Sequence, residues 1–341
     1  MSFFEQYGKV LQELYDISNP IIKYKIDKEF YGKDNISIEQ YISFEDSSIK
    51  YWLNTYNSDK IHGREDCAYE NSIAKLLEYG LTKNDQTFNQ LFSILLEDEH
   101  WKVDTSFEGI LMKTVKYPFL IRAGYYDNKH INSYFHDRLQ KIEKAIETYG
   151  YDFKDINNKI PQKYKDQFIF KFNNKLESLP TFYDLYAFAF YPHNNADTTR
   201  RIEKIVQYLL DEKFQNIPKK AYIHDIEKKR YYAAGNVYHA CMIEERKLLT
   251  IFLLSHFKTV GGNDLFMNEL KKLLSYRCHD GFYEFDKSLI KEKKDGYYIY
   301  SGSHMGLGEK RSNTNWRKIE STFWMLKILL NLETNNIEVL P

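Results

Sequence analysis

Each of the three cysteines in the chain has a histidine close to it in sequence. The candidate metal ligands are Cys67, His239, Cys241, Cys278 and His279, and His62 lies near the first cysteine. Zinc is held in proteins by thiolate, imidazole and carboxylate groups, with one position left open in enzymes. No C-x-x-C or H-x-x-x-H spacing occurs, and isolated cysteines are more often small buried residues. No cofactor is evident from the sequence: zinc is the one that these residues would suit, and three structural cysteines are the alternative.

Charged and aromatic residues also gather at the starts of several predicted helices. Those with acid–base chemistry, our candidate catalytic residues, are Asp66, Glu70, Tyr117 and His239. Those able to hold a substrate are Tyr69, Lys113, Lys116, Tyr183, Tyr238, Trp316, Arg317, Glu320 and Trp324. Paired carboxylates beside Tyr, His and Arg can supply a general acid and a general base. The alternative interpretation is that these residues cap helices and bridge neighbouring elements.

A glycine-rich stretch, residues 302–311, precedes the last predicted helix. It lacks the G-x-x-x-x-G-K-[ST] phosphate motif and does not complete G-x-G-x-x-G, so neither nucleotide-binding motif is present. Two basic residues at its end would suit a loop over a cavity, and a surface connection is the simpler interpretation. We assign no function to the charge clusters at 244–247 and 291–294.

The elements that must position these residues are helices in pairs. In residues 85–98 the apolar positions Phe88, Leu91, Phe92, Leu95 and Leu96 follow the period of a helix with one buried stripe. Asp85 stands at the N-cap position, and Gly80 and Gly124 stand where helices end in the left-handed conformation. The predicted pairs are 67–79 with 85–98, 107–123 with 129–149, 182–191 with 199–214, and 237–257 with 265–276, followed by 316–332. Residues 4–15 and a start at Asn19-Pro20 add helices near the N-terminus.

In each pair the first helix is apolar around much of its circumference and the second has a single apolar stripe. A helix that is apolar on all sides belongs inside a fold, whereas a one-striped helix faces water. Repeated inner and outer helices build an open solenoid or a closed α/α barrel, and the uneven spacing excludes a regular 34-residue array. We predict an all-α fold: an α/α toroid over residues 61–341, with residues 1–60 as a helical extension packed on it.

Composition narrows the class of protein further. Fifteen glycines and seven prolines among 341 residues favour helices over turn-dense sheets, and aromatic residues make up 16% of the chain. Forty-eight basic and 48 acidic residues balance, so the basic excess of a nucleic-acid-binding domain is absent. The sequence shows no signal peptide and no apolar run long enough to cross a bilayer. We expect a cytoplasmic protein with a small-molecule ligand, no nucleic-acid partner and no membrane span.

The repeated pairs resemble the terpenoid cyclase and protein prenyltransferase superfamily of α/α toroids. The turn Asp280-Gly281-Phe282 and the run at 316–326, WRKIESTFWML, carry this resemblance over roughly residues 60–335. It implies a toroid fold and, if the protein is an enzyme, a cyclase or transferase. The D-x-D-D and D-D-x-x-D motifs of terpenoid enzymes are absent. Glu65-Asp66-Cys67 and the segment 237–241 only partly match prenyltransferase zinc segments, and Cys278-His279-Asp280-Gly281 comes close to the Cys-His-Gly motif of lanthionine cyclases.

Three functions stay open on the sequence alone. The first is an enzyme or binder with an aromatic-lined central cavity for an isoprenoid-like or other elongated hydrophobic substrate. Lys116 and Arg317 would then hold an anionic group. The second is a carbohydrate-active or carbohydrate-binding α/α barrel, because aromatic platforms beside carboxylates also suit sugar rings. The third is a binding scaffold without catalysis, which the missing signature motifs favour.

Overall fold

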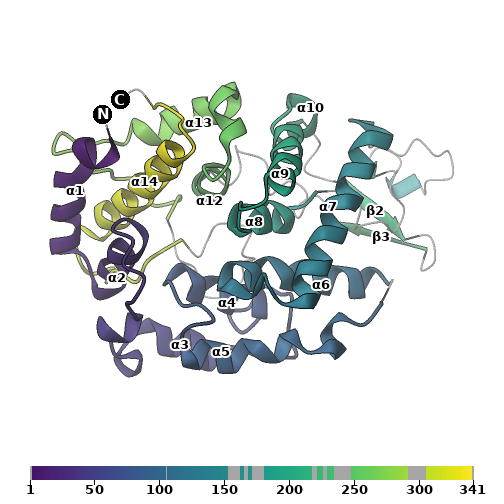
Figure 1. Ribbon diagram of the computed structural model, residues 1–341, viewed down its shortest axis with the longest axis horizontal. Coiled ribbons are helices and arrows are strands. Elements are labelled where there is room, and N and C mark those ends of the chain that lie inside the picture. Colours follow the sequence, from purple (N-terminus) through teal and green to yellow (C-terminus); the bar gives the residue numbers. More distant parts are fainter. Residues whose placement is uncertain are drawn as a thin grey trace. The chain divides into compact units, whose positions relative to one another are not determined.

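A computed structural model describes residues 2–104, 106–152, 162–164, 168–170, 180–216, 221–225, 229–233, 247–290 and 305–339. The chain forms two compact units (Figure 1). The terminal unit combines Met1–Ile94 with Arg246–Pro341, and the central unit is Leu95–Glu245. Each is described here by itself. The boundary expected at residue 60 concerns a toroid and its extension, and it stays a prediction.

Helices make up the described part of the terminal unit. The α-helices are α1 (Phe3–Ile17), α2 (Pro20–Glu29), α3 (Ser48–Thr55), α4 (Tyr69–Glu78), α5 (Gln86–Phe92), α12 (Lys247–Leu254), α13 (Asp264–Leu274) and α14 (Trp316–Thr334). Short 3-10 helices are η1 (Ile38–Gln40), η2 (Phe44–Asp46) and η9 (Lys258–Gly262), and η3 (Ser93–Leu96) lies at the boundary of the two units. Helix α14 packs on α1 and α12, α12 on α13, and α3 on α4.

The central unit holds the other helices and a small sheet. Its helical elements are η4 (Asp98–Trp101), α6 (Phe107–Leu120), the π-helical turn η5 (Ile121–Tyr125), α7 (Lys129–Tyr149), η6 (Gln162–Tyr164), α8 (Phe182–Phe190), α9 (Ala196–Leu209) and α10 (Glu212–Gln215). Helix α6 packs on α7 and α8, and α7 packs on α9. Helix α8 is buried from Phe182 to Ala189, whereas α9 buries one stripe. The expected contrast between a helix buried on all sides and a helix with one buried stripe is therefore present within this unit.

Local sequence signals account for several helix boundaries. The Asn19 side chain accepts the Ile22 N–H at 3.0 Å and Pro20 is the first residue of α2, as predicted. Gly80 and Gly124 both have a positive φ, 95° and 98°, which glycine adopts at the ends of helices without a steric penalty. The mostly helical fold that the sequence predicts is confirmed.

Three details differ from the sequence predictions. The Asp85 carboxylate accepts the Thr82 N–H at 2.7 Å instead of capping α5, because the preceding turn offers a nearer donor. Helix α5 ends at Phe92 and continues as 3-10 turns. Helix α9 begins at Ala196, three residues earlier than expected, because Asn195 accepts the Thr198 N–H. Only the second half of the helix predicted at 237–257 lies within the described residues.

A three-stranded sheet in the central unit was not predicted. Strand β2 (Ala221–Asp225) pairs in parallel with β1 (Phe168–Phe170) and antiparallel with β3 (Arg230–Ala233). Ala221 and Ile223 are buried and the residue between them is half-buried, so β2 has the alternation of a strand with one covered face. None of the described helices is both long and apolar enough to cross a lipid bilayer.

Candidate functional site

A loop and the first turn of α4 bring several predicted residues together in the terminal unit. The Asn57 N–H donates to the Cys67 carbonyl at 2.9 Å, and the Tyr69 N–H donates to the Lys60 carbonyl at 2.8 Å, so the loop wraps around the helix start. The Tyr69 ring is buried and packs edge to face on Phe92. Asp66, also buried, accepts the Tyr51 hydroxyl at 2.9 Å.

Glu70 contacts a histidine from the same loop. Its carboxylate is fully buried, accepts the Gly63 N–H at 2.9 Å, and lies 2.6 Å from Nδ1 of His62. The His62 side chain is 21% exposed. The contact has the distance of an ion pair, but Nδ1 does not meet hydrogen-bond geometry with the carboxylate. A carboxylate beside one ring nitrogen favours the protonated imidazole and leaves the other nitrogen for proton transfer. The proximity of the two groups therefore makes the pair a candidate acid–base dyad.

A second cluster surrounds Glu320 on α14. One carboxylate oxygen accepts the N–H groups of Leu307 and Glu309 at 2.8 and 3.1 Å, and the other lies 2.8 Å from Arg311. Burial raises the pKa of Glu320. Backbone N–H groups in the described part of the glycine-rich segment thus bind a carboxyl group of the same chain, that of Glu320 on α14. The Trp324 indole donates to the Met305 carbonyl at 2.7 Å and fixes the same segment.

Lys75 approaches this segment from α4. Its ammonium donates to the Gly306 carbonyl at 2.6 Å, and burial lowers its pKa to about 7, while Glu320 acts in the opposite direction.

Two predicted substrate-binding residues in the first turn of α14, Trp316 and Arg317, have partners within the protein. The Trp316 ring lies 3.8 Å beneath the Arg311 guanidinium, and Arg317 donates to Glu284 from Nε at 2.8 Å.

In the central unit, Tyr117 is buried among charged groups. Its hydroxyl donates to Asp184, which pairs with Arg138 and caps α8 together with Thr181. Burial and the Asp184 carboxylate raise the pKa of Tyr117 well above its ordinary value, so the hydroxyl stays protonated. Tyr183 is fully buried and packs edge to face on Phe119.

Two lysines lie one turn apart on α6. Lys116 is buried, donates to the His100 carbonyl at 2.9 Å, and lies 5.3 Å over the Trp101 ring. Burial lowers its pKa to about 8, and the charge of Lys113 lowers it further in the same direction. The middle of α6 therefore carries two neighbouring lysines, one of them beside an aromatic ring.

The predicted zinc ligands are only partly described. Cys67 and Cys278 are half-buried free thiols, and burial raises the pKa of Cys278. His279 is exposed. Among the residues that the structure describes, no group of three or more His, Cys, Asp and Glu side chains could hold a metal ion. Tyr238, His239 and Cys241 lie outside those residues, so a zinc site that includes them stays a prediction.

Sequence reasoning missed several partners of the predicted residues. The sequence drew attention to His62 only because it lies near Cys67. Neither Lys75 nor Arg138 was among the predicted site residues. The signal for the last two is a charged residue within an apolar helix face, which needs a counter-charge when buried. No known family model, curated protein or solved structure matches this chain.

Proposed function

We propose that this protein is an α/α-toroid enzyme in which His62, oriented by Glu70, transfers protons. The helix pairs within each unit support the toroid: buried helices such as α4 and α8 alternate with one-striped helices such as α9 and α13. The observation that carries the activity is the 2.6 Å contact between His62 Nδ1 and the fully buried Glu70 carboxylate.

The surroundings of the dyad suit a proton-transfer role. Glu70 is fixed by the Gly63 N–H, so the carboxylate keeps its position when the imidazole gains or loses a proton. His62 remains partly exposed, which lets its second ring nitrogen reach a substrate. A histidine held in this way contributes about 100-fold to 10,000-fold to a reaction rate. Asp66 on the same loop is held by Tyr51 and stays a candidate for the second acid–base group.

The substrate class in this proposal is an elongated hydrophobic molecule of the isoprenoid type, and an oligosaccharide is the alternative. The test incubates the purified chain with geranyl and farnesyl diphosphate and, separately, with neutral glucan and xylan oligosaccharides. Released diphosphate, altered isoprenoid products and new reducing ends are measured. We expect turnover with one panel, lowered about 100-fold or more by both His62→Gln and Glu70→Gln.

His279→Gln separates the dyad from the zinc hypothesis, because His279 is an exposed histidine of the same unit and one of the predicted zinc ligands. It should leave turnover unchanged. If His279→Gln and Cys278→Ala abolish turnover while His62→Gln does not, the zinc hypothesis replaces the dyad. If neither panel is turned over by the wild-type chain, the enzyme proposal is wrong and the binding scaffold remains.

Ligand binding by the lysine pair of α6 is a second candidate function. The charge of Lys113 disfavours that of Lys116, and an anionic group between them would relieve that repulsion. Trp101 beside Lys116 offers an apolar surface. An isoprenoid diphosphate combines both properties, so this site favours an anionic amphiphile over a neutral glycan.

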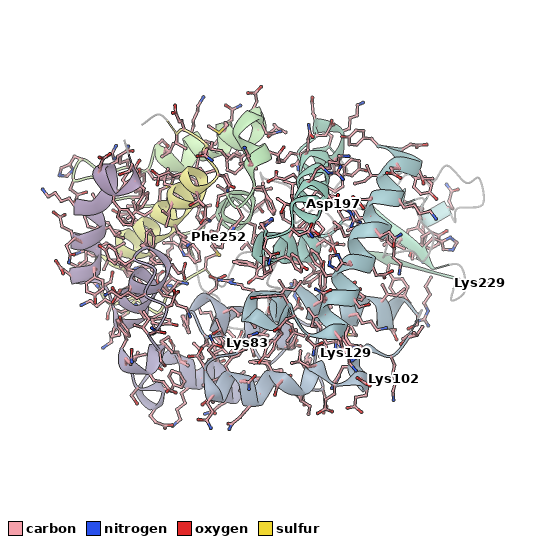
Figure 2. All side chains as sticks on the ribbon, viewed as in Figure 1. Lys83, Lys102, Lys129, Asp197, Lys229 and Phe252 are labelled. Atoms are coloured by element: carbon pink, nitrogen blue, oxygen red, sulfur yellow. The ribbon has the colours of Figure 1, made fainter. Side chains whose placement is uncertain are left out.

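Titration calorimetry with geranyl diphosphate tests this candidate, with geraniol and inorganic diphosphate as partial ligands. Lys113→Met should weaken binding of geranyl diphosphate about tenfold, which corresponds to about 1.4 kcal/mol. Lys102→Met is the control, since Lys102 is an exposed lysine of the same unit (Figure 2). Equal binding of geraniol and geranyl diphosphate would exclude a role for the lysines.

A further inference from the structure

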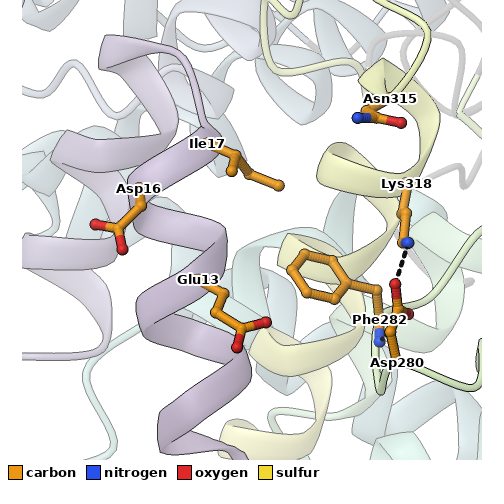
Figure 3. Close-up of a pocket in the computed structure, with 7 residues that line it drawn as sticks. All are labelled: Glu13, Asp16, Ile17, Asp280, Phe282, Asn315 and Lys318. Atoms are coloured by element: carbon orange, nitrogen blue, oxygen red, sulfur yellow. Dashed lines mark hydrogen bonds and ion pairs between the residues drawn. The ribbon is translucent and has the colours of Figure 1, made fainter.

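The terminal unit has a cavity of about 340 Å³ between the C-terminal half of α1 and the first turn of α14 (Figure 3). None of the residues that line it belongs to the His62–Glu70 dyad or to the cluster around Glu320. Glu13, Asp16 and Ile17 come from α1, Asp280 and Phe282 from the turn that follows α13, and Asn315 and Lys318 from the N-cap and first turn of α14. The cavity is therefore a separate candidate site.

Two features fix the walls of this cavity. The Phe3 N–H donates to the Glu333 carboxylate at 2.6 Å, while Ile17 and Lys318 meet at the cavity, so α1 and α14 run antiparallel. The turn is closed by the Cys278 N–H, which donates to the Phe282 carbonyl at 2.7 Å. Both walls thus belong to regular, hydrogen-bonded structure.

The cavity already stabilises one primary ammonium. Lys318 contacts the Asp280 carboxylate, which raises its pKa, and its nitrogen lies 5.1 Å from the centre of the Phe282 ring (Figure 3). A carboxylate and an aromatic face are the two groups that bind alkylammonium ions. Because Asp280 neutralises Lys318, this pair adds no net charge to the cavity.

The α1 wall is left with an excess of negative charge. The Glu13 carboxylate turns toward Phe282, and that of Asp16 turns outward (Figure 3). Glu13 lies 3.8 Å from Lys9, but Lys9 is 90% exposed, and such surface pairs contribute little. The Ile17 side chain is 49% exposed and reaches into the space between the helices, so an aliphatic surface lies beside the carboxylates.

We propose that this cavity binds a small alkylammonium ion. The ammonium would contact the Glu13 carboxylate, and the alkyl chain would lie along Ile17 and the edge of Phe282. An anion of the same size would be repelled by the Glu13 carboxylate, and it would gain little from Lys318, which Asp280 already neutralises. A neutral alcohol would gain only the apolar contacts. The site therefore selects a ligand first by its positive charge and second by its alkyl chain. This proposal does not depend on the activity proposed for the His62–Glu70 dyad.

Titration calorimetry on the full chain tests this with n-butylamine and 1,4-diaminobutane, against butanol and butyrate as isosteric neutral and anionic probes. The amines should bind, the diamine more tightly, and butyrate should show no heat of binding. Glu13→Gln should weaken amine binding about tenfold, whereas Glu39→Gln, at an exposed glutamate of the same unit, should leave it unchanged.

Ile17→Ser supplies the second variant, because it alters the apolar wall without changing charge. It should weaken butylamine binding while leaving the preference for amine over butyrate intact. The far-ultraviolet circular dichroism of each variant should match that of the wild type. The proposal is overturned if neither amine binds the wild-type chain, if butanol binds as tightly as butylamine, or if Glu13→Gln binds amines as the wild type does.

Discussion

Arg138 and Asp184 form a fully buried ion pair between α7 and α8 of the central unit. Nε of Arg138 donates to Oδ1 of Asp184 at 2.9 Å, and the second guanidinium nitrogen donates to Oδ2 at 2.5 Å. Asp184 also accepts the backbone N–H and the hydroxyl of Thr181, each at 2.8 Å. With the Tyr117 hydroxyl on Oδ1, this carboxylate joins α6, α7 and α8.

Asp184→Asn should therefore destabilise the chain strongly. The substitution keeps the shape of the side chain but leaves the Arg138 guanidinium buried without a counter-charge. Breaking a buried pair in this way costs about 3–5 kcal/mol. Urea unfolding followed by circular dichroism measures the change in the free energy of unfolding.

Asp197→Asn provides the matched control. Asp197, labelled in Figure 2, pairs with Arg200 one turn further along α9, and both side chains are largely exposed. Its free energy of unfolding should change by less than about 0.5 kcal/mol. Similar losses for the two aspartates would mean that the Arg138–Asp184 pair is solvated.

Signals carried by neighbouring residues predicted much of the helical fold. Helix α7 has the predicted bounds, Lys129–Tyr149, because Asn128 caps it at one end and Gly150 follows at the other. Asn19 and Gly80 set boundaries in the same local way. The sheet was missed because its strands are short and come from separate segments, so that their pairing depends on tertiary structure.

Local sequence signals did not predict the contacts made within the candidate site. Glu70 and Tyr117 were selected for residue type and for their place near a helix start or on a predicted inner helix. Which group each one contacts depends on distant chain segments. Lys75 meets the carbonyl of Gly306, 231 residues away, and Asp184 meets Arg138 from another helix. Periodicity and caps carry no information on such contacts, so the sequence indicated where polar groups gather but not which of them pair.

Tyr117→Phe separates a structural from a catalytic role for this residue. Its hydroxyl donates to the Asp184 carboxylate within the buried cluster, so removing it should cost about 1.5–3 kcal/mol of stability. We expect any turnover found with the substrate panels to be unchanged by this variant. A loss of turnover with unaltered stability would instead support the catalytic role expected from the sequence.

Gly281→Ala should destabilise the turn that forms one wall of the cavity. Gly281 has φ of 86°, and an added Cβ would lie 3.1 Å from a methyl carbon of Val10. A side chain in this conformation costs about 1–2 kcal/mol. Gly262→Ala is the control, because nothing lies within 4 Å of an added Cβ there and its φ is not positive. Thermal unfolding should show a lower midpoint for Gly281→Ala alone; equal midpoints would mean that the turn adapts.

The stability of the chain should rise with pH above neutrality because of Lys75. Burial lowers its pKa from 10.5 in the ordinary state to about 7 in the folded chain, where Glu320, Glu78, Asp66 and Arg311 are the charged groups that act on it. Between these two values the unfolded chain binds a proton that the folded chain lacks, so raising the pH favours folding. Below about pH 7 the full penalty of the buried ammonium is present.

Comparison with Lys75→Met isolates this contribution. The free energy of unfolding of the wild type minus that of the variant should increase between pH 7 and pH 9, by up to about 1.4 kcal/mol per pH unit. The loss of the bond to Gly306 shifts the variant by a constant amount and leaves this slope unaffected. For Lys271→Met, at an exposed lysine of α13, the difference from the wild type in free energy of unfolding should not change with pH. A pH-independent difference for Lys75→Met would mean that Lys75 keeps its charge throughout this range, stabilised by the carboxylates around it.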